Sequence, residues 1–162
     1  MSKRINEYDI KVDLDISKCE GDVVKTAEEI CRRMYFIEIY TPVRFGDIKV
    51  YETKRGFHLY IDLKEPAYLK KNKAFIVILQ LLLMSDWKRE VFNLSRVMSM
   101  FFLNVEYENW NILFYCKRDT KGNYSIERRT YLSIMFEKIL QNYEKIGETI
   151  FDQNEKEVII DK

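Results

Sequence analysis

The chain has 162 residues, 47% of them hydrophobic and 33% charged, which fits one folded domain and excludes a disordered chain. A formal net charge of +1, from 27 Lys and Arg against 26 Asp and Glu, excludes both a strongly basic coat for DNA and a strongly acidic tail. The sequence also contains no GxGxxG and no Walker A motif, so the two common nucleotide-binding fingerprints are missing.

Three further features restrict the classes of protein to which the chain can belong: its cysteines, its single histidine and its apolar runs. The 3 cysteines form no CxxC motif, which predicts a reduced protein in the cytoplasm, or in the host cytoplasm if the chain is viral. Because His58 is the only histidine, a metal site with two histidines is excluded within one chain. The longest apolar run, 75–84, is too short to cross a bilayer, and the N-terminus does not resemble a signal peptide, so we expect no membrane partner.

The first half of the chain predicts a strand, a helix and a hairpin. Residues 8–16 alternate apolar and charged side chains, which is the pattern of a strand with one buried face. Gly21 and Asp22 then lead into a predicted helix that runs to about residue 35. The arms of a predicted hairpin follow at 47–52 and 57–63, joined by a turn in which Gly56 can adopt a positive φ.

The second half predicts mainly helices. They are expected at 67–84, 88–101 and 125–146, the last closed by Gly147. The run 75–78 also fits a buried strand. Another strand is predicted at 111–117, with a turn at 119–123, and the tail 148–162 predicts a short hairpin.

This order of elements predicts an α+β fold. A strand, a helix, a hairpin, further helices and a last strand suggest a split βαβ, ferredoxin-like or RRM-like core. In such a core the helices cover one face of an antiparallel sheet, and the other face stays open. We expect residues 1–118 to form this core and residues 119–162 to add a C-terminal helix and tail packed on the same domain.

The open face of the predicted sheet carries acidic side chains. Asp13 and Asp15 are two residues apart on a strand, so their carboxylates point the same way and repel each other when ionised. A divalent cation relieves this repulsion, and Mg²⁺ is commonly held by one or two carboxylates together with substrate phosphates. The alternative is an ordinary solvated strand face. His58, Tyr60 and Asp62 share the predicted face on the later strand.

Basic and aromatic residues suggest contacts with nucleic acid. Lys54 and Arg55 precede Gly56 in the turn and could hold phosphate, or form an ordinary charged turn. Aromatic rings on an open sheet face can stack on bases, although most tyrosines pack in cores; the candidates are Tyr51, Tyr60 and Tyr115. A further basic cluster comprises Lys117, Arg118, Lys121, Arg128 and Arg129.

Two segments resemble motifs of the archaeo-eukaryotic primases and primase-polymerases. Residues 12–16 (VDLDI) resemble the first motif, a hydrophobic strand with Asp-x-Asp. Residues 53–60 (TKRGFHLY) resemble the second, a turn followed by a glycine and a strand with x-His, although Lys54 and Arg55 are bulkier than usual. The third motif is another acidic residue, and its candidates are Asp86, Asp62 and Asp119. The segment 86–96 (DWKREVFNLSR) is also similar to an Asp…Arg stretch of the family, and the resemblance covers about residues 8–118.

The resemblance implies a metal-dependent nucleotidyltransferase acting on single-stranded DNA or RNA templates. Asp13, Asp15 and Asp86 would bind Mg²⁺ or Mn²⁺, and His58 would contact the triphosphate of the incoming nucleotide. Lys54, Arg55 and Tyr60 would complete the nucleotide-binding site. The reaction would be attack of a 3′-hydroxyl on the α-phosphate of a nucleoside triphosphate, with pyrophosphate leaving. A minimal chain of this kind suits a virus or plasmid of archaea, with a replication protein or a second copy as partner.

Three other classes of protein are also compatible with the sequence. A non-catalytic module that binds single strands, or an accessory replication subunit, could use the same fold without metal. A replication-initiation nuclease would need a His-x-His pair, which His58-Leu59-Tyr60 lacks, and a nucleophilic tyrosine such as Tyr131. A structural or interaction protein is compatible with the balanced charge.

Overall fold

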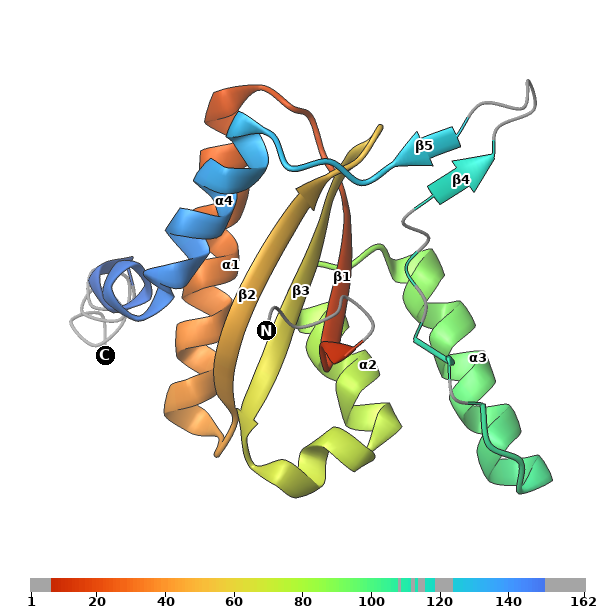
Figure 1. Cartoon of the computed structure of the whole chain (residues 1–162). Helices are drawn as coiled ribbons and strands as arrows, with labels where there is room; N and C mark the ends of the chain where they lie inside the picture. The colour runs from red at the N-terminus through yellow and green to blue at the C-terminus, as the bar shows by residue number, and fades with distance from the viewer. Residues whose placement is uncertain (1–6, 108, 112, 114–115, 119–123, 151–162) are drawn as a thin grey trace, which may run out of the picture.

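The computed structural model of the chain describes residues 7–107, 109–111, 113, 116–118 and 124–150. At its centre lies an antiparallel sheet with the strand order β1–β3–β2, formed by β1 (Ile10–Asp15), β2 (Arg44–Glu52) and β3 (Gly56–Glu65). The helix α1 (Glu20–Tyr40) connects β1 to β2, and β3 returns between them (Figure 1). The α+β class and the split βαβ core are therefore confirmed.

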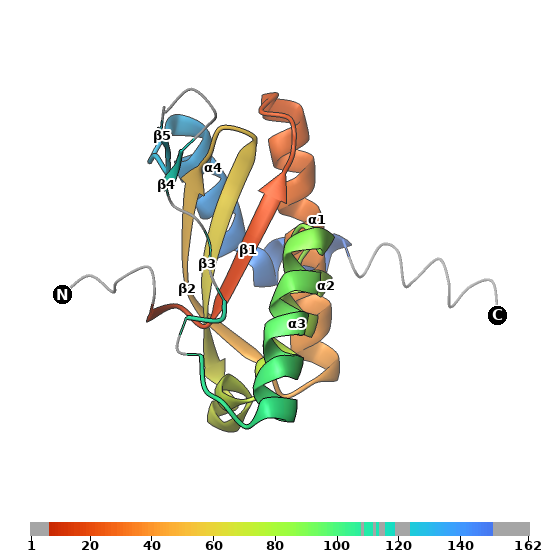
Figure 2. The same cartoon turned by 90° about the vertical axis from the view of Figure 1, so that its right-hand side faces the viewer.

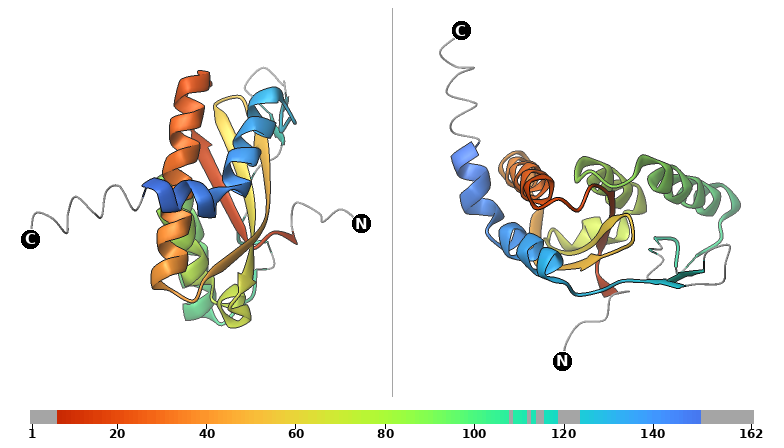
Figure 3. Two further views of the ribbon diagram at one scale, coloured as in Figure 1. Left: turned by 90° about the vertical axis from the view of Figure 1, so that its left-hand side faces the viewer. Right: turned by 90° about the horizontal axis from the view of Figure 1, so that it is seen from above.

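One face of this sheet is apolar and packs against helices. The alternation predicted for β1 is confirmed, because Ile10, Val12 and Leu14 are at most 2% exposed. They share a core with apolar side chains of β2, β3, α1, α2 (Lys73–Leu82) and α4 (Tyr131–Gln141). Figure 2 shows α1 and α2 on the same side of the sheet, and Figure 3 shows α4 beside α1. Helices thus cover one face, as predicted.

The helix predicted at 67–84 is divided into two pieces. A 3₁₀ helix, η2 (Ala67–Lys71), precedes α2, and Asn72 caps α2 by accepting a hydrogen bond from the Phe75 N–H at 3.2 Å. The run 75–78 is therefore helical, and the alternative of a buried strand is wrong. The next helix, α3 (Trp87–Leu103), is slightly longer than predicted. None of the helices in the described part of the chain is long and apolar enough to span a membrane.

The segment after α3 differs from the prediction. Of the strand predicted at 111–117, the described residues 111 and 113 are not in a strand, and β4 (Cys116–Arg118) forms at its end. In the described part of the chain β4 pairs with β5 (Tyr124–Ile126) and not with the central sheet. The helix predicted from residue 125 starts only after Thr130, whose hydroxyl accepts a hydrogen bond from the Ser133 N–H in a capping box. The predicted turn 119–123 and residues 151–162 of the predicted tail hairpin lie outside the described residues.

Gly147 does not close the last helix, so this prediction is wrong. The helix breaks at Asn142 instead, and Gly147 lies inside the helical residues 143–150. A Cβ atom at this position would be 2.4 Å from the Cβ of Tyr35 on α1. Glycine is therefore required here because this segment packs closely against α1, and not because the chain turns.

Candidate functional site

The structure brings Asp13 and His58 together across two neighbouring strands. Asp13 on β1 is directly opposite His58 on β3, and Asp15 is opposite Gly56. The Asp13 Oδ1 lies 3.4 Å from the His58 Nε2. Gly56 permits this register, because a Cβ atom there would be only 1.9 Å from the carbonyl oxygen of Leu14.

A second carboxylate holds the other side of the imidazole. The His58 Nδ1 lies 2.6 Å from the Glu127 Oε1, and the Tyr60 hydroxyl donates a hydrogen bond to the same oxygen. Ionised carboxylates only accept hydrogen bonds, so an imidazole between two of them is favoured in its protonated form, in which both ring nitrogens donate. Glu127 follows β5 in a stretch that the sequence assigned to a helix, and nothing in its local pattern marked it as a site residue.

The pKa of His58 reflects this arrangement. Burial of the ring favours the neutral form, but the hydrogen bonds to Asp13 and Glu127 outweigh burial and raise the pKa above its usual value of 6.5. Burial and the hydrogen bond to Glu127 also raise the pKa of Tyr60. The tyrosine therefore stays protonated and acts as a hydrogen-bond donor.

The face of the sheet that carries His58 is covered at its centre. Tyr60 is 0% exposed because Tyr8 and Leu113 pack with it in a small second core, and His58 is 6% exposed. The expectation of an open face is therefore wrong for these two residues. Tyr51 is half-buried against Tyr60, and Tyr115 lies outside the described residues. A buried Tyr60 is not available to stack on a base in this conformation.

The backbone of Asp86 is hydrogen-bonded to the backbone of Asp13. The Asp86 N–H donates a hydrogen bond of 2.7 Å to the carbonyl oxygen of Asp13, and the Asp13 N–H donates one of 3.1 Å to the Ser85 Oγ. The segment between α2 and α3 therefore runs along the outer edge of β1. Of the other candidates for the third acidic residue, Asp62 lies further along β3, away from Gly56, and Asp119 lies outside the described residues.

A buried polar cluster around Glu90 fixes this segment. Glu90 is 1% exposed and accepts hydrogen bonds from the Gln80 Nε2 at 2.6 Å, the Ser85 Oγ at 2.7 Å and the Asn93 Nδ2 at 3.0 Å. Arg89 donates to Glu90 and, at 2.8 Å, to the carbonyl oxygen of Lys11 on β1. Within the segment 86–96, Arg89, Glu90 and Asn93 thus join α2 and α3 to the edge of β1.

The predicted basic residues separate into two groups. Lys54 and Arg55 are exposed in the turn before Gly56, which is opposite Asp15. Arg129 instead pairs with Glu137 of α4, and Arg128 pairs with Glu52 at 3.5 Å. The side chains of Lys117 and Arg118, and the whole of Lys121, lie outside the described residues. The turn therefore places two exposed cations, Lys54 and Arg55, next to Asp15 at the end of β1.

The carboxylates of Asp13 and Asp15, at the end of β1, suit a hard divalent cation. Asp15 is exposed, and the Asp13 side chain is 34% exposed. Among the described residues no three His, Cys, Asp or Glu side chains form a metal site by themselves. Mg²⁺ commonly uses one or two carboxylates and completes its shell with substrate phosphates and water, so the donor set of Asp13 and Asp15 fits such an ion.

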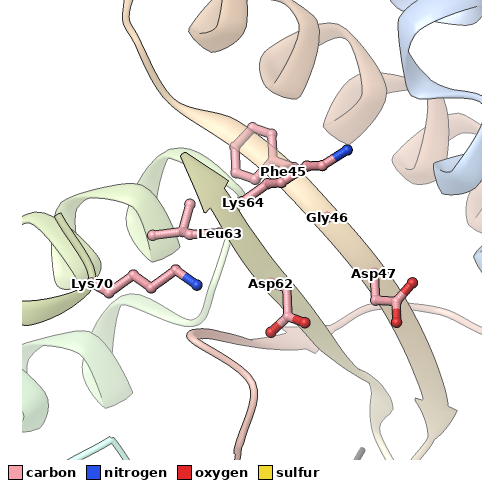
Figure 4. Close-up of a pocket in the computed structure, with 7 residues that line it drawn as sticks. All are labelled: Phe45, Gly46, Asp47, Asp62, Leu63, Lys64 and Lys70. Atoms are coloured by element: carbon pink, nitrogen blue, oxygen red, sulfur yellow. The ribbon is translucent and has the colours of Figure 1, made fainter. Parts of the chain in front are cut away.

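A shallow pocket lies at the other end of β3. It has a volume of about 560 Å³ and is lined by residues of β2, β3 and η2, namely Phe45, Gly46, Asp47, Asp62, Leu63, Lys64 and Lys70 (Figure 4). Asp62 is the single candidate from the sequence that contributes to it. The pocket is therefore separate from the pair of Asp13 and His58.

Comparison of the chain with protein-family models, curated proteins and solved structures found no match.

Proposed function

We propose that the protein is a metal-dependent nucleotidyltransferase of the primase-polymerase type that acts on single-stranded nucleic acid. The observation that carries this proposal is the pairing of Asp13 with His58 across β1 and β3, with Asp86 hydrogen-bonded to the backbone of Asp13. The two motifs that resemble the primases thereby lie side by side, with the favoured candidate for the third acidic residue next to them.

Each residue has a role that follows from its surroundings. The exposed Asp15 and the half-exposed Asp13 would hold Mg²⁺ or Mn²⁺ together with the phosphates of the nucleotide. When bound, the cation would supply stabilisation of the negative charge that develops on the reacting phosphate. His58, buried between two carboxylates, is a positioning residue that orients Asp13. Contact with the triphosphate falls to the exposed Lys54 and Arg55.

Nucleotide incorporation on primed and unprimed single-stranded templates tests this proposal. We expect the wild-type chain to incorporate nucleotides with Mg²⁺ or Mn²⁺. Metal-ion catalysis is worth several kcal/mol, so Asp15→Asn should lower the rate by roughly 100-fold or more. Asp15 is exposed, so this variant should still fold.

Asp47→Asn is the matched control, since Asp47 is an exposed aspartate on β2 that lines the separate pocket. It should retain the wild-type rate. Equal incorporation by wild type and Asp15→Asn would contradict the proposal. Single-strand binding without any incorporation would favour a non-catalytic binding module.

A further inference from the structure

An apolar stripe with coiled-coil spacing runs along the exposed side of α3. Its members follow one another at intervals of four, three, four and three residues: Trp87, Val91, Leu94, Met98 and Phe101. We call this set the α3 stripe. This is the heptad spacing at which one helix packs against another, with Val91 and Met98 at one core position and the other three at the second.

The α3 stripe faces away from the body of the molecule. The buried residues of α3 are Asn93 and Met100, which lie on a different side of the helix, and Glu90, which borders the stripe. The stripe residues are 40 to 81% exposed, with Phe101 the most exposed. Figure 1 shows α3 standing at one side of the molecule, next to α2 and away from β2.

The apolar area is large enough for a protein interface. A fully exposed aromatic side chain offers about 150–250 Å², so the α3 stripe with its neighbour Phe102 exposes roughly 700 Å². A standard interface buries about 800 Å² on each partner. The largest apolar patch of a typical monomer is about 300–600 Å², so the exposed area on α3 is larger than a monomer usually shows.

The charges beside the α3 stripe favour a second copy in antiparallel orientation. Of the residues that flank it, Lys88 is charged and exposed, while Glu90 is buried with Arg89. A parallel pair would place the two Lys88 ammonium groups at the same level of the helix pair, so their like charges would not be separated along its length. An antiparallel pair centred on Leu94 would separate them along the helix axis by 12 residues, roughly 18 Å at 1.5 Å per residue.

We propose that the α3 stripe is a dimer interface, on which a second copy of the chain docks its own α3 in antiparallel orientation. A two-fold axis would pass close to Leu94, which is central in the stripe. Such an interface is self-complementary and closed, so it stops at two copies. The inference does not depend on the proposed catalytic activity.

The molar mass in solution, measured by light scattering during size-exclusion chromatography, tests the dimer. We expect wild type to have twice the monomer mass of 19.7 kDa when loaded at roughly 10–100 µM, since association follows mass action. Met98→Glu/Phe101→Glu, which places charges in the stripe, should be monomeric. Circular dichroism shows whether this variant stays folded.

Phe92→Glu/Leu103→Glu is the matched control, because both residues are exposed on α3 but lie outside the stripe. This variant should remain dimeric, and so should Asp15→Asn. A monomeric wild type would overturn the proposal, as would a dimer that survives Met98→Glu/Phe101→Glu.

Discussion

At the scale of single residues, His58 is held by two carboxylates that come from distant parts of the chain. Asp13 lies on the neighbouring strand, and Glu127 follows β5. Because the ring is buried, these charges act at short range and with little screening by water. The His58 ring therefore orients the Asp13 carboxylate.

The raised pKa of His58 makes part of the stability depend on pH. A cation whose pKa is higher in the folded than in the unfolded state stabilises the fold below the unfolded-state value, near the usual 6.5. This contribution is lost as the pH rises through the folded-state pKa. Glu127→Gln removes one neighbouring charge, so it should lower the pKa of His58 and reduce this pH dependence.

An NMR titration of the imidazole signals measures this effect directly, since His58 is the only histidine of the chain. We expect a pKa above 6.5 in wild type and a lower value in Glu127→Gln. A wild-type value at or below 6.5 would show that burial, not the carboxylates, dominates at this site.

The residues of the site differ in how far the sequence could predict them. Asp13, Asp15 and His58 were placed on one face because alternation along a strand is a local property. Glu127 was missed because its role depends on a contact between residues 69 positions apart. Tyr60 was expected on an open face, and its burial by Tyr8 and Leu113 depends on segments whose path no local pattern determines.

At the scale of elements, the cluster around Glu90 attaches α2 and α3 to β1. Its hydrogen bonds satisfy buried polar groups of three elements, and the pair of Glu90 with Arg89 is nearly inaccessible to water. Burial lowers the pKa of Arg89, while the charge of Glu90 opposes this shift. Removing the carboxylate would leave a buried guanidinium without its anion.

We expect Glu90→Ala to lower the free energy of unfolding by about 3–5 kcal/mol, the usual cost of breaking a buried ion pair. Urea denaturation followed by circular dichroism measures this change. Glu106→Ala is a suitable comparison, because the pair of Glu106 with Lys73 is exposed and should contribute little. A loss for Glu90→Ala no greater than that for Glu106→Ala would mean that the cluster does not stabilise these contacts.

The elements that the sequence predicted best are those set by local pattern. The hairpin β2–β3 and the helices α1 and α3 follow from alternation and helical periodicity. Three differences arise from particular residues: Asn72 caps α2 and divides one helix, Thr130 caps α4 and delays another, and Gly147 serves a contact with α1. Helix capping and close packing depend on which residues are neighbours in space. The periodicity of the sequence does not contain this information.

At the scale of the whole molecule, α3 links the candidate site to the proposed dimer interface. Its N-cap is Asp86, whose backbone is bonded to Asp13, and its first residue is Trp87 of the α3 stripe. The carboxylates of Asp13 and Asp15 and the α3 stripe thus lie close to the start of α3, but on different faces of the molecule. Both can therefore be tested separately by substitution.

We propose that the Gly56 end of the sheet binds a divalent cation together with a nucleoside triphosphate. Paramagnetic broadening by Mn²⁺ tests it most directly, because the His58 ring lies 3.4 Å from the Asp13 carboxylate and reports on an ion bound there. With a nucleoside triphosphate present, we expect Mn²⁺ to broaden the His58 signals in wild type and in Asp47→Asn, but far less in Asp15→Asn. Sharp His58 signals at saturating Mn²⁺, or equal broadening in Asp15→Asn, would mean that no cation binds at Asp13 and Asp15.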